Sequence, residues 1–466
     1  MKDFLKINSV AIFTKILGAI FSLLSIFFLT RVLDKSEYGK YVLLSSTVNI
    51  FSVIFFQWLA VVASRYLTMN PKYISFYIKN NLLLISSILF FLIFSLSFLF
   101  NDSQFWIIGI TSISFGIYNV KLQIENSLES WRSYNLLLLS KYIATFVFLL
   151  LFLYFFKSAI FAILALFIGT IISIVINKKS FDNFNFNEKI EINLFKFGVT
   201  YTIILILNSL IDFADRFLIK YFKGYFSVGQ YSANYDLIQQ TFGGVLGVFA
   251  IYFTPKILKS KNQNSLLSFD KLNKRYLNFS LICGSFLALN FFIAYPIISM
   301  VISEKYRYIT FFEEFFILFG IFIGIIKGTI FDLNLQIEGR FKILIYNMLI
   351  MAFVNFFLNI FLIPKYDQLG AAFATFITFL IGLSISIYFS LRYIKVYNYI
   401  ISDLIKLIVI TFTFLYLNST FMSNSNLYII FKNIFFTMFF FILIFFMNLF
   451  GSRSYFKLVK KNLLNF

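Results

Sequence analysis

Residues 8–30 read NSVAIFTKILGAIFSLLSIFFLT, an apolar run interrupted by a single charge at Lys15. A helix needs about 20 apolar residues to cross the roughly 30 Å hydrocarbon core of a bilayer, so this run is long enough to span a membrane. Lys2 and Lys6 precede the run as in a signal peptide, but it is too long for one and has no small-residue cleavage site. We therefore expect a membrane-spanning helix that is retained.

Runs of the same kind fill most of the remaining chain, in which 60% of the residues are hydrophobic and 13% are charged. This composition differs from that of soluble proteins and predicts an all-α polytopic membrane protein with about fourteen membrane-spanning helices. The predicted spans cover residues 8–30, 41–62, 82–100, 105–120, 135–156, 159–176, 197–214, 229–253, 277–302, 311–336, 342–363, 369–390, 400–418 and 427–450.

The residues that several protein classes need are missing. The sequence has no histidine and one cysteine, Cys283, which removes the commonest metal ligand, the usual general base and any intrachain disulfide. It also has no phosphate-binding loop for a nucleotide. The net charge of +20 comes from basic residues in short loops, where it indicates topology rather than nucleic-acid binding. We expect a transporter without metal or cofactor, not an enzyme.

Basic residues gather in alternate loops. The loops at residues 177–196 and 255–276 are rich in lysine, whereas residues 419–426 contain no basic residue. Because basic loops remain on the cytoplasmic side of a membrane, this pattern predicts that both termini are cytoplasmic.

Short motifs recur six spans apart. Tyr38-Gly39 opens the second span and Gly229-Gln230 opens the eighth, while the letters LQIE end the fourth span at 122–125 and the tenth at 335–338. Because six is even, the two halves keep one orientation, as in parallel repeats that place a substrate path between them. The predicted division is a six-helix bundle over residues 1–196, a second over 197–395, and two appended helices with a tail over 396–466.

Other motifs fall at the ends of spans: Arg31, Arg65, Asp215-Arg216, Pro255 and NIFLIPKYDQLGAA at residues 359–372. With the glycine motifs, they resemble the Wzx-type polysaccharide flippases of the multidrug/oligosaccharidyl-lipid/polysaccharide (MOP) exporter superfamily. The resemblance covers the whole chain. It implies two six-helix bundles in a V shape, as in MATE transporters, followed by two helices.

The same resemblance implies a function. Such a flippase moves undecaprenyl-pyrophosphate-linked oligosaccharide units of O-antigen, capsule or exopolysaccharide across the bacterial inner membrane by alternating access. Its implied partners are the lipid-linked oligosaccharide, the bilayer, and a polysaccharide polymerase or chain-length protein. Without a nucleotide motif, the energy would come from a gradient of H⁺ or Na⁺ or from removal of the product.

Three other functions stay open. A multidrug exporter of the same superfamily needs acidic cavity residues for organic cations, whereas the deep charges noted here are lysines. Lipid II flippases of the superfamily carry several arginines in their first two spans, where this chain has Lys15, Arg31 and Arg65. A membrane-embedded glycosyltransferase or polysaccharide polymerase generally needs a large external loop, and no predicted external loop is long.

Lys15 and Lys327 are the first candidate substrate-binding residues, because a charge inside a bilayer is costly and usually functional. Lys15 lies on a face of small and polar residues, although its side chain is near enough to the inner surface to snorkel there. Lys327 lies deeper, beside Gly320, Gly324 and Gly328, whose spacing also suits close helix packing. The sequence predicts that these two cations hold a pyrophosphate.

Polar residues in two spans complete the expected site. They either bind sugar hydroxyls or join helices by hydrogen bonds, and they are Asn49, Gln57, Gln239 and Gln240. Charged residues near span ends are expected to act in gating or ion pairs, and they are Arg31, Arg65, Asp212, Asp215, Arg216 and Asp332. Among these, Asp212 and Arg216 have the i to i+4 spacing of a helical ion pair. Glu125 and Glu338 are candidates for ion coupling.

Overall fold

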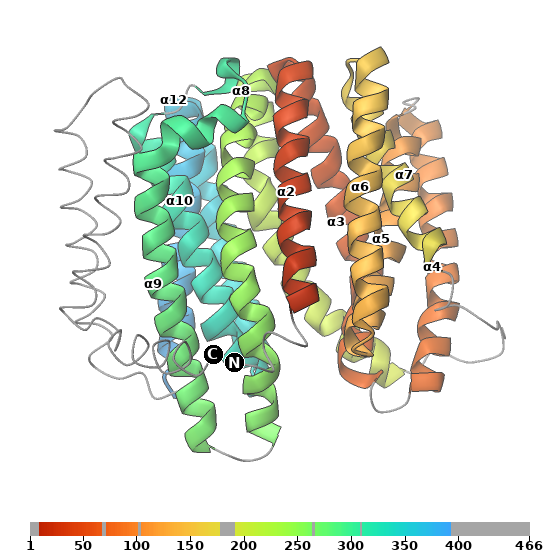
Figure 1. Cartoon of the computed structure of the whole chain (residues 1–466), viewed down its shortest axis with the longest axis vertical. Helices are drawn as coiled ribbons and strands as arrows, with labels where there is room; N and C mark the ends of the chain where they lie inside the picture. The colour runs from red at the N-terminus through yellow and green to blue at the C-terminus, as the bar shows by residue number, and fades with distance from the viewer. Residues whose placement is uncertain are drawn as a thin grey trace, which may run out of the picture. The chain divides into compact units, whose positions relative to one another are not determined.

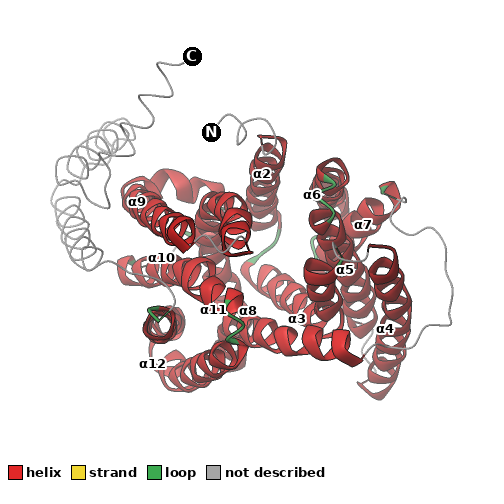
Figure 2. Cartoon of the chain, turned by 90° about the horizontal axis from the view of Figure 1, so that it is seen from below, coloured by secondary structure: helices red, strands yellow, loops and turns green. Residues whose placement is uncertain are grey.

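The computed structural model describes residues 9–67, 71–100, 104–177, 192–262, 266–307 and 310–392, and these residues are almost entirely helical. Six of the described helices precede residue 177 and run side by side (Figures 1 and 2). They are α2 (Ser9–Val32), α3 (Lys35–Tyr66), α4 (Pro71–Phe100), α5 (Gln104–Ser127), α6 (Trp131–Phe155) and α7 (Ala159–Ile176). The first six predicted spans therefore correspond to six helices.

The described helices after residue 177 include two that contain an internal break. They are α8 (Ile192–Asn262), α9 (Leu266–Ile298), α10 (Phe311–Ile326), α11 (Leu333–Ile337) and α12 (Phe341–Ser390), with 3-10 turns η2 (Ser299–Val301) and η3 (Glu304–Tyr306) and the π-helical turn η4 (Lys327–Asp332). Gly224 interrupts α8 with a φ of 83°, and Asp367 interrupts α12 with a φ of 52°. Each break falls between two predicted spans, so each long helix supplies two of them.

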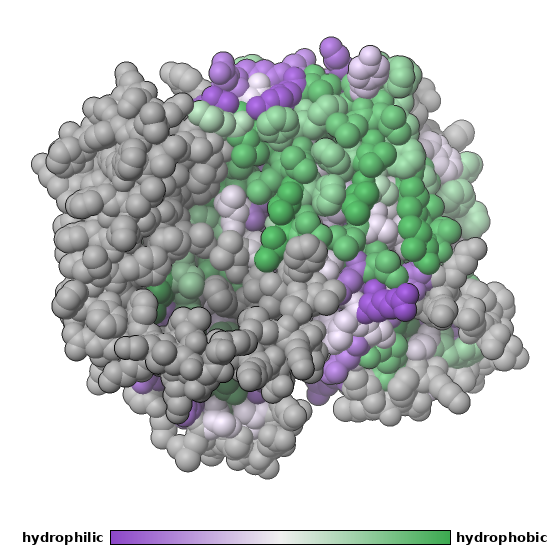
Figure 3. Space-filling view, in the orientation of Figure 1, coloured by the Kyte–Doolittle hydropathy of each residue, from purple (hydrophilic) through white to green (hydrophobic). Residues whose placement is uncertain are grey.

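Eight helices among the described residues are long and apolar enough to cross a membrane, counting α8 and α12 once each. Their outward faces carry exposed apolar side chains such as Phe91, Phe155 and Phe353, and Figure 3 shows a broad apolar face. Such a surface suits lipid rather than water. The chain is therefore a multi-pass membrane protein, while the predicted spans at 400–418 and 427–450 lie outside the described residues.

The chain forms two compact units. One comprises Met1–Gln240, Ile302–Ile317 and Phe341–Gly382, and the other comprises Thr241–Val301, Leu318–Arg340 and Leu383–Phe466. In the first unit, α5 packs against α3, α4, α6 and α7, and α2 packs against α6. The division at residues 196 and 395 expected from the sequence stays a prediction.

The predicted repeat is partly visible in the turns that end α5 and α11. Ser130 N donates to Glu125 O at 3.0 Å, and Arg340 N donates to Leu335 O at 2.9 Å. The residues before these donors, Glu129 and Gly339, both have positive φ. When these two turns are matched, Glu125 corresponds to Leu335. The LQIE motif ends at Glu125 in the first turn but begins at Leu335 in the second, so the two motifs differ in position by about one helical turn.

Candidate functional site

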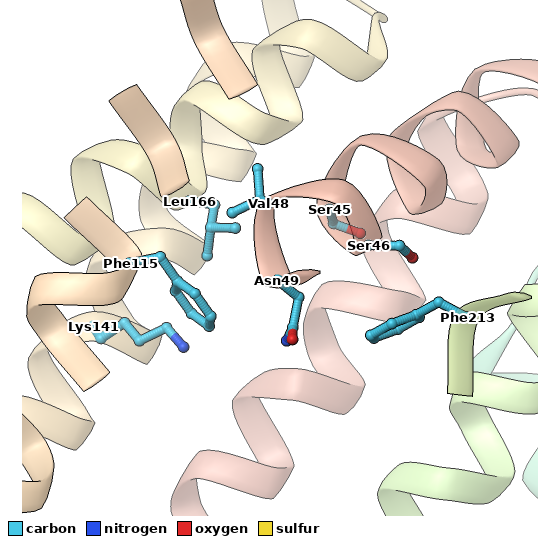
Figure 4. A pocket seen from close by; sticks show the side chains of 8 residues that line it. All are labelled: Ser45, Ser46, Val48, Asn49, Phe115, Lys141, Leu166 and Phe213. Carbon is cyan, nitrogen blue, oxygen red and sulfur yellow. The ribbon is translucent and has the colours of Figure 1, made fainter. Parts of the chain in front are cut away.

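A cavity of about 210 Å³ opens within the first unit, among helices that are candidate membrane spans. Figure 4 shows the side chains that line it from α3, α5, α6, α7 and α8. They are Ser45, Ser46, Val48, Asn49, Phe115, Lys141, Leu166 and Phe213. The cavity thus combines a cation, an amide and two hydroxyls with aromatic and aliphatic walls, and no carboxylate is among its lining residues.

Lys141 of α6 is the charged residue of this cavity. Its ammonium lies 4.7 Å from the ring centre of Phe115, 4.9 Å from that of Tyr118 and 5.2 Å from that of Tyr142. Aromatic faces stabilise a cation without neutralising it. Within the described part of the chain, no carboxylate forms an ion pair with Lys141. Its positive charge therefore stays available to an anion.

Asn49 of α3 faces the same space. In Figure 4 the polar ends of Asn49 and Lys141 point into the cavity, with Phe115 beside the lysine and Phe213 beyond the asparagine. The hydroxyls of Ser45 and Ser46 each donate to Val42 O, at 2.9 and 2.8 Å. Their lone pairs remain able to accept hydrogen bonds from a ligand.

Helix α2 reaches Lys141 through Tyr142. A Cβ on Gly18 would lie 2.8 Å from Tyr142 Cε2, so the absence of a side chain there lets the ring pack against α2. The phenol of Tyr142 also forms a hydrogen bond with Ser22, one turn further along α2. The small and polar face of α2 is thus turned toward α6. The side chain of Lys15 lies outside the described residues.

A second cluster of polar side chains connects the two parts of α8 that lie on either side of Gly224. Arg216 Nη2 lies 2.8 Å from Asp236 Oδ1, and the Arg216 side chain is only 5% exposed. Tyr231 Oη donates to Asp215 Oδ2 at 2.7 Å, and Tyr38 of α3 donates to Asp236 Oδ2 at 3.4 Å. Asp215 and Arg216, both predicted to act in gating or ion pairs, are thus bonded to residues that were not predicted for this role.

The expected partner of Arg216 was wrong. Asp212 accepts a hydrogen bond from Asn208 Nδ2 at 3.0 Å, while the guanidinium pairs with Asp236. The i to i+4 rule considers one straight helix, but the break at Gly224 brings the second part of α8 alongside the first. The tertiary partner therefore replaces the local one.

The repeated glycine motifs meet next to these ion pairs. A Cβ on Gly39 would lie 2.1 Å from Tyr225 O, and a Cβ on Gly229 would lie 1.9 Å from Lys35 O. Only glycine permits α3 and α8 to approach this closely. Lys35 Nζ then donates to Gln230 Oε1 at 3.1 Å. The two motifs that suggested an internal repeat are thus the contact surfaces of one helix crossing.

Residues 302–307 cover the turn between α2 and α3. Lys305 Nζ and Tyr306 Oη both donate to Leu33 O, at 2.6 and 3.1 Å, and Asn234 Nδ2 donates to Tyr306 O at 3.0 Å. Burial lowers the pKa of Lys305, while nearby Asp34 acts in the opposite direction. This end of the first unit is therefore held by polar contacts between segments far apart in the sequence.

Lys327 has a different environment from Lys141. Its Nζ lies 2.6 Å from Asp332 Oδ2, and both side chains are 3% exposed. Ser386 Oγ donates to the other oxygen of Asp332 at 2.5 Å. The pair spans the π-helical turn η4, in which residues five apart lie one turn apart. Lys327 is buried as expected, but its charge is matched by Asp332, and its role in substrate binding stays a proposal.

The other predicted binding residues lie outside the cavity wall. Gln57 and Gln240 are half-buried, Gln239 is exposed, and none of the three lines the cavity. Arg65 is exposed and lies 4.4 Å above the ring centre of Phe197, while Arg31 lies 3.4 Å above Phe27. Of the predicted polar residues, Asn49 is the one that the structure brings to the cavity.

Lys141 was not among the site residues predicted from the sequence. It falls within the predicted span 135–156, so the depth criterion applied to Lys15 and Lys327 also selects it. Its aromatic neighbours were not predictable in the same way, because Phe115 and Tyr118 come from another helix. Glu338 forms an ion pair with Lys261, and its role in ion coupling stays a prediction.

Comparison with known proteins identifies the family. The profile of the family described as "Polysaccharide biosynthesis protein" matches residues 4–254. The chain belongs to this family. A search of curated proteins finds no match. The structure matches one described as "Lipid II flippase MurJ, inward closed conformation", with a TM-score of 0.70, 15% identity, and coverage of 97% of this chain and 99% of that chain.

Solved transporters of the MOP superfamily have a similar fold. An inward-facing MATE multidrug resistance transporter matches with a TM-score of 0.62 and 9% identity, over 80% of this chain and 94% of that chain. A MOP transporter from Pyrococcus furiosus, described as having a binding pocket of reversed polarity, matches with a TM-score of 0.58 and 11% identity, over 83% of this chain and 94% of that chain. The chain thus belongs to the family described as polysaccharide biosynthesis proteins and has the fold of these flippase and multidrug-transporter structures.

Proposed function

We propose that this protein is a transporter of the MOP superfamily, specifically a Wzx-type flippase that moves undecaprenyl-pyrophosphate-linked oligosaccharide units across the bacterial inner membrane with both termini in the cytoplasm. The observation that carries the proposal is the cavity that contains Lys141. Its cation has aromatic neighbours instead of a carboxylate, and the Asn49 amide lies in the same space. The site therefore offers a positive charge to phosphate and a polar group to sugar.

The physical reason for such a site is desolvation. Phosphate charges and sugar hydroxyls lose their hydration if they enter hydrocarbon, at a cost that is prohibitive without new partners. A polar cavity inside the bundle supplies those partners. Lysine binds phosphate as a point charge, and asparagine both donates to and accepts from hydroxyls. The polyprenyl chain stays in the lipid while alternating access exposes the head group to each side.

The same cavity argues against the drug-exporting alternative. Organic cations are stabilised by carboxylates or by aromatic faces without a competing cation, whereas here Lys141 occupies the aromatic faces and no acid lines the wall. A lipid II flippase remains the second candidate, because lipid II is also a polyprenyl diphosphate and MurJ shares the fold. The two functions differ in the sugars that are carried.

Reconstituted protein tests the proposal. Proteoliposomes are loaded with a fluorescent polyprenyl-diphosphate oligosaccharide, and its exposure to an external glycan-binding protein is measured over time. A charged hydrogen bond contributes about 1.5–3 kcal/mol, so Lys141→Met is expected to lower the initial rate at subsaturating substrate by about tenfold or more. The exposed Lys157 of the neighbouring turn supplies the control, and Lys157→Met is expected to keep the wild-type rate.

Two further arms separate the possible outcomes. Lys141→Arg preserves the positive charge and is expected to keep most of the activity. Lipid II, presented in the same assay, distinguishes the second candidate by its rate. Equal rates for Lys141→Met and the wild-type protein would remove Lys141 from substrate binding, and transport of an organic cation without the lipid-linked glycan would overturn the proposed function.

A further inference from the structure

A cluster of four cations lies where α2 ends and α3 begins, in the first unit and apart from the residues that line the Lys141 cavity. Its members, named here the four-cation cluster, are Arg31, Lys35, Lys305 and Arg307. Lys305 reaches the same turn through its 2.6 Å hydrogen bond to Leu33 O. Arg307 is close enough to Arg31, and Lys305 to Lys35, for their charges to repel. The fold thus brings like charges together from segments about 270 residues apart.

Carbonyl and amide oxygens accept hydrogen bonds from three of these cations. Arg31 Nη1 donates to Phe27 O at 3.1 Å, and Lys35 Nζ donates to the amide oxygen of Gln230 at 3.1 Å. Arg307 Nε donates to Ile302 O at 3.2 Å. Carbonyl and amide oxygens orient a cation without cancelling its charge.

The acids of the same turns do not balance the cluster. Asp34 Oδ1 accepts from Glu37 N at 2.7 Å as the N-cap of α3. Glu304 lies 3.8 Å from Arg307 with its side chain 91% exposed, which makes a weak surface pair. The third acid of these turns, Glu37, pairs with Lys40, so the four cations outnumber Asp34 and Glu304. An anionic ligand would relieve the repulsion that remains.

Apolar rings lie directly beside the charges. The Arg31 guanidinium stacks 3.4 Å above the Phe27 ring centre, and Lys35 Nζ lies 4.5 Å from that of Phe226. Phe27 is 40% exposed and Phe226 is 54% exposed. Figure 3 shows hydrophilic side chains gathered along the edge of an apolar face. Cations bordered by exposed rings match a molecule that has a phosphate head and a hydrocarbon tail.

We propose that the four-cation cluster binds the phosphate head group of an anionic lipid. The guanidinium groups of Arg31 and Arg307 supply paired donors for phosphate oxygens, and the two ammonium groups add point charges. The lipid tail lies along Phe27 and Phe226. This site is independent of the proposed cargo and is distinct from the cavity around Lys141.

Native mass spectrometry of the purified full chain tests the site. Detergent-solubilised protein is titrated with phosphatidylglycerol and, separately, with phosphatidylcholine. Removing two cations with Lys305→Gln and Arg307→Gln is expected to weaken the tightest phosphatidylglycerol binding by about tenfold or more and to leave phosphatidylcholine unchanged. The charge-preserving double variant Lys305→Arg and Arg307→Lys is expected to bind as the wild type does, which separates loss of charge from loss of fold.

Arg340 and Lys342 give a matched control. They have the same spacing as Lys305 and Arg307 and the same residue types in reverse order, and both are exposed at the start of α12. Arg340→Gln with Lys342→Gln is expected to keep the tightest phosphatidylglycerol site. Wild-type lipid affinity in the Lys305/Arg307 glutamine variant would overturn the proposal. Binding of inorganic diphosphate without binding of phosphatidylglycerol would also overturn the proposal, because that result indicates a site for free phosphate.

Discussion

Lys141 and Lys327 both lie inside membrane-spanning helices, but their surroundings differ: Lys141 has aromatic neighbours, and Lys327 has a carboxylate partner. Lys141 lies among three aromatic rings beside a cavity, without a carboxylate partner in the described part of the chain. Lys327 forms a buried ion pair with Asp332, and Ser386 donates a hydrogen bond to the same carboxylate. The sequence made Lys327 a candidate because it is deep. The structure shows that depth identifies both lysines, but only the surroundings separate an available charge from a neutralised one.

Removing the partner of Lys327 is expected to have the largest effect. Asp332→Ala leaves a buried ammonium without its counter-charge, which costs about 3–5 kcal/mol. We expect a large fall in thermal stability, measured by the loss of monodisperse protein after heating in detergent. The double variant Lys327→Met with Asp332→Leu removes both charges and is expected to recover most of that stability. A stable Asp332→Ala protein would mean that the ion pair is not what keeps Lys327 in the bundle.

The opposite result is expected for Lys141. Among the residues that the structure describes no carboxylate pairs with it, so Lys141→Met is expected to change stability by less than about 1 kcal/mol while transport of the lipid-linked glycan falls. The same heating assay gives the stability of the variant that was tested for transport. If Lys141→Met were as unstable as Asp332→Ala, both lysines would be structural and the comparison would fail.

A third change gives Lys141 an acidic neighbour. Placing an acid opposite Lys141 with Asn49→Asp gives the cavity lysine the kind of partner that Lys327 has. Because Asn49 and Lys141 face the same space, the new carboxylate is expected to neutralise the ammonium and repel a phosphate, lowering transport by about tenfold. Asn49→Ser keeps the site neutral and is the control. Equal transport by the two variants would show that the charge balance of this cavity does not govern the cargo.

Much of the fold could be predicted from sequence because a bilayer imposes one rule on every span. Apolar runs of sufficient length correctly predicted the helices from α2 to α7. They also predicted the two spans that each of α8 and α12 supplies. The glycine motifs were recognised as a repeat, and their mutual contact explains why Gly39 and Gly229 have no side chains. The number of spans after residue 392 stays a prediction, since those residues lie outside the described part.

The candidate site was less predictable because it depends on contacts between helices. Asn49 was selected for its polarity within an apolar run, and it lines the cavity. Arg216 was assigned to Asp212 by local spacing, whereas the break at Gly224 gives it Asp236. The rings of Phe115 and Tyr118 reach Lys141 from α5, a contact that no spacing along α6 reveals. Sequence thus locates polar atoms by depth, and tertiary packing decides which of them are satisfied.

The smallest expected effect concerns the rings around Lys141. Phe115→Leu removes the nearest of the three rings but keeps the cavity apolar, and a cation–π contact at such a site contributes about 0.5–1 kcal/mol. We expect the ammonium to lose part of its orientation toward Asn49, so that the apparent KM for the lipid-linked glycan rises about two- to fivefold with kcat unchanged. Phe148→Leu, on the same helix as Lys141 but packed against Phe152, is expected to leave KM unchanged. A change in kcat without a change in KM would instead place Phe115 in the conformational step, and the rings would then not serve to position the charge.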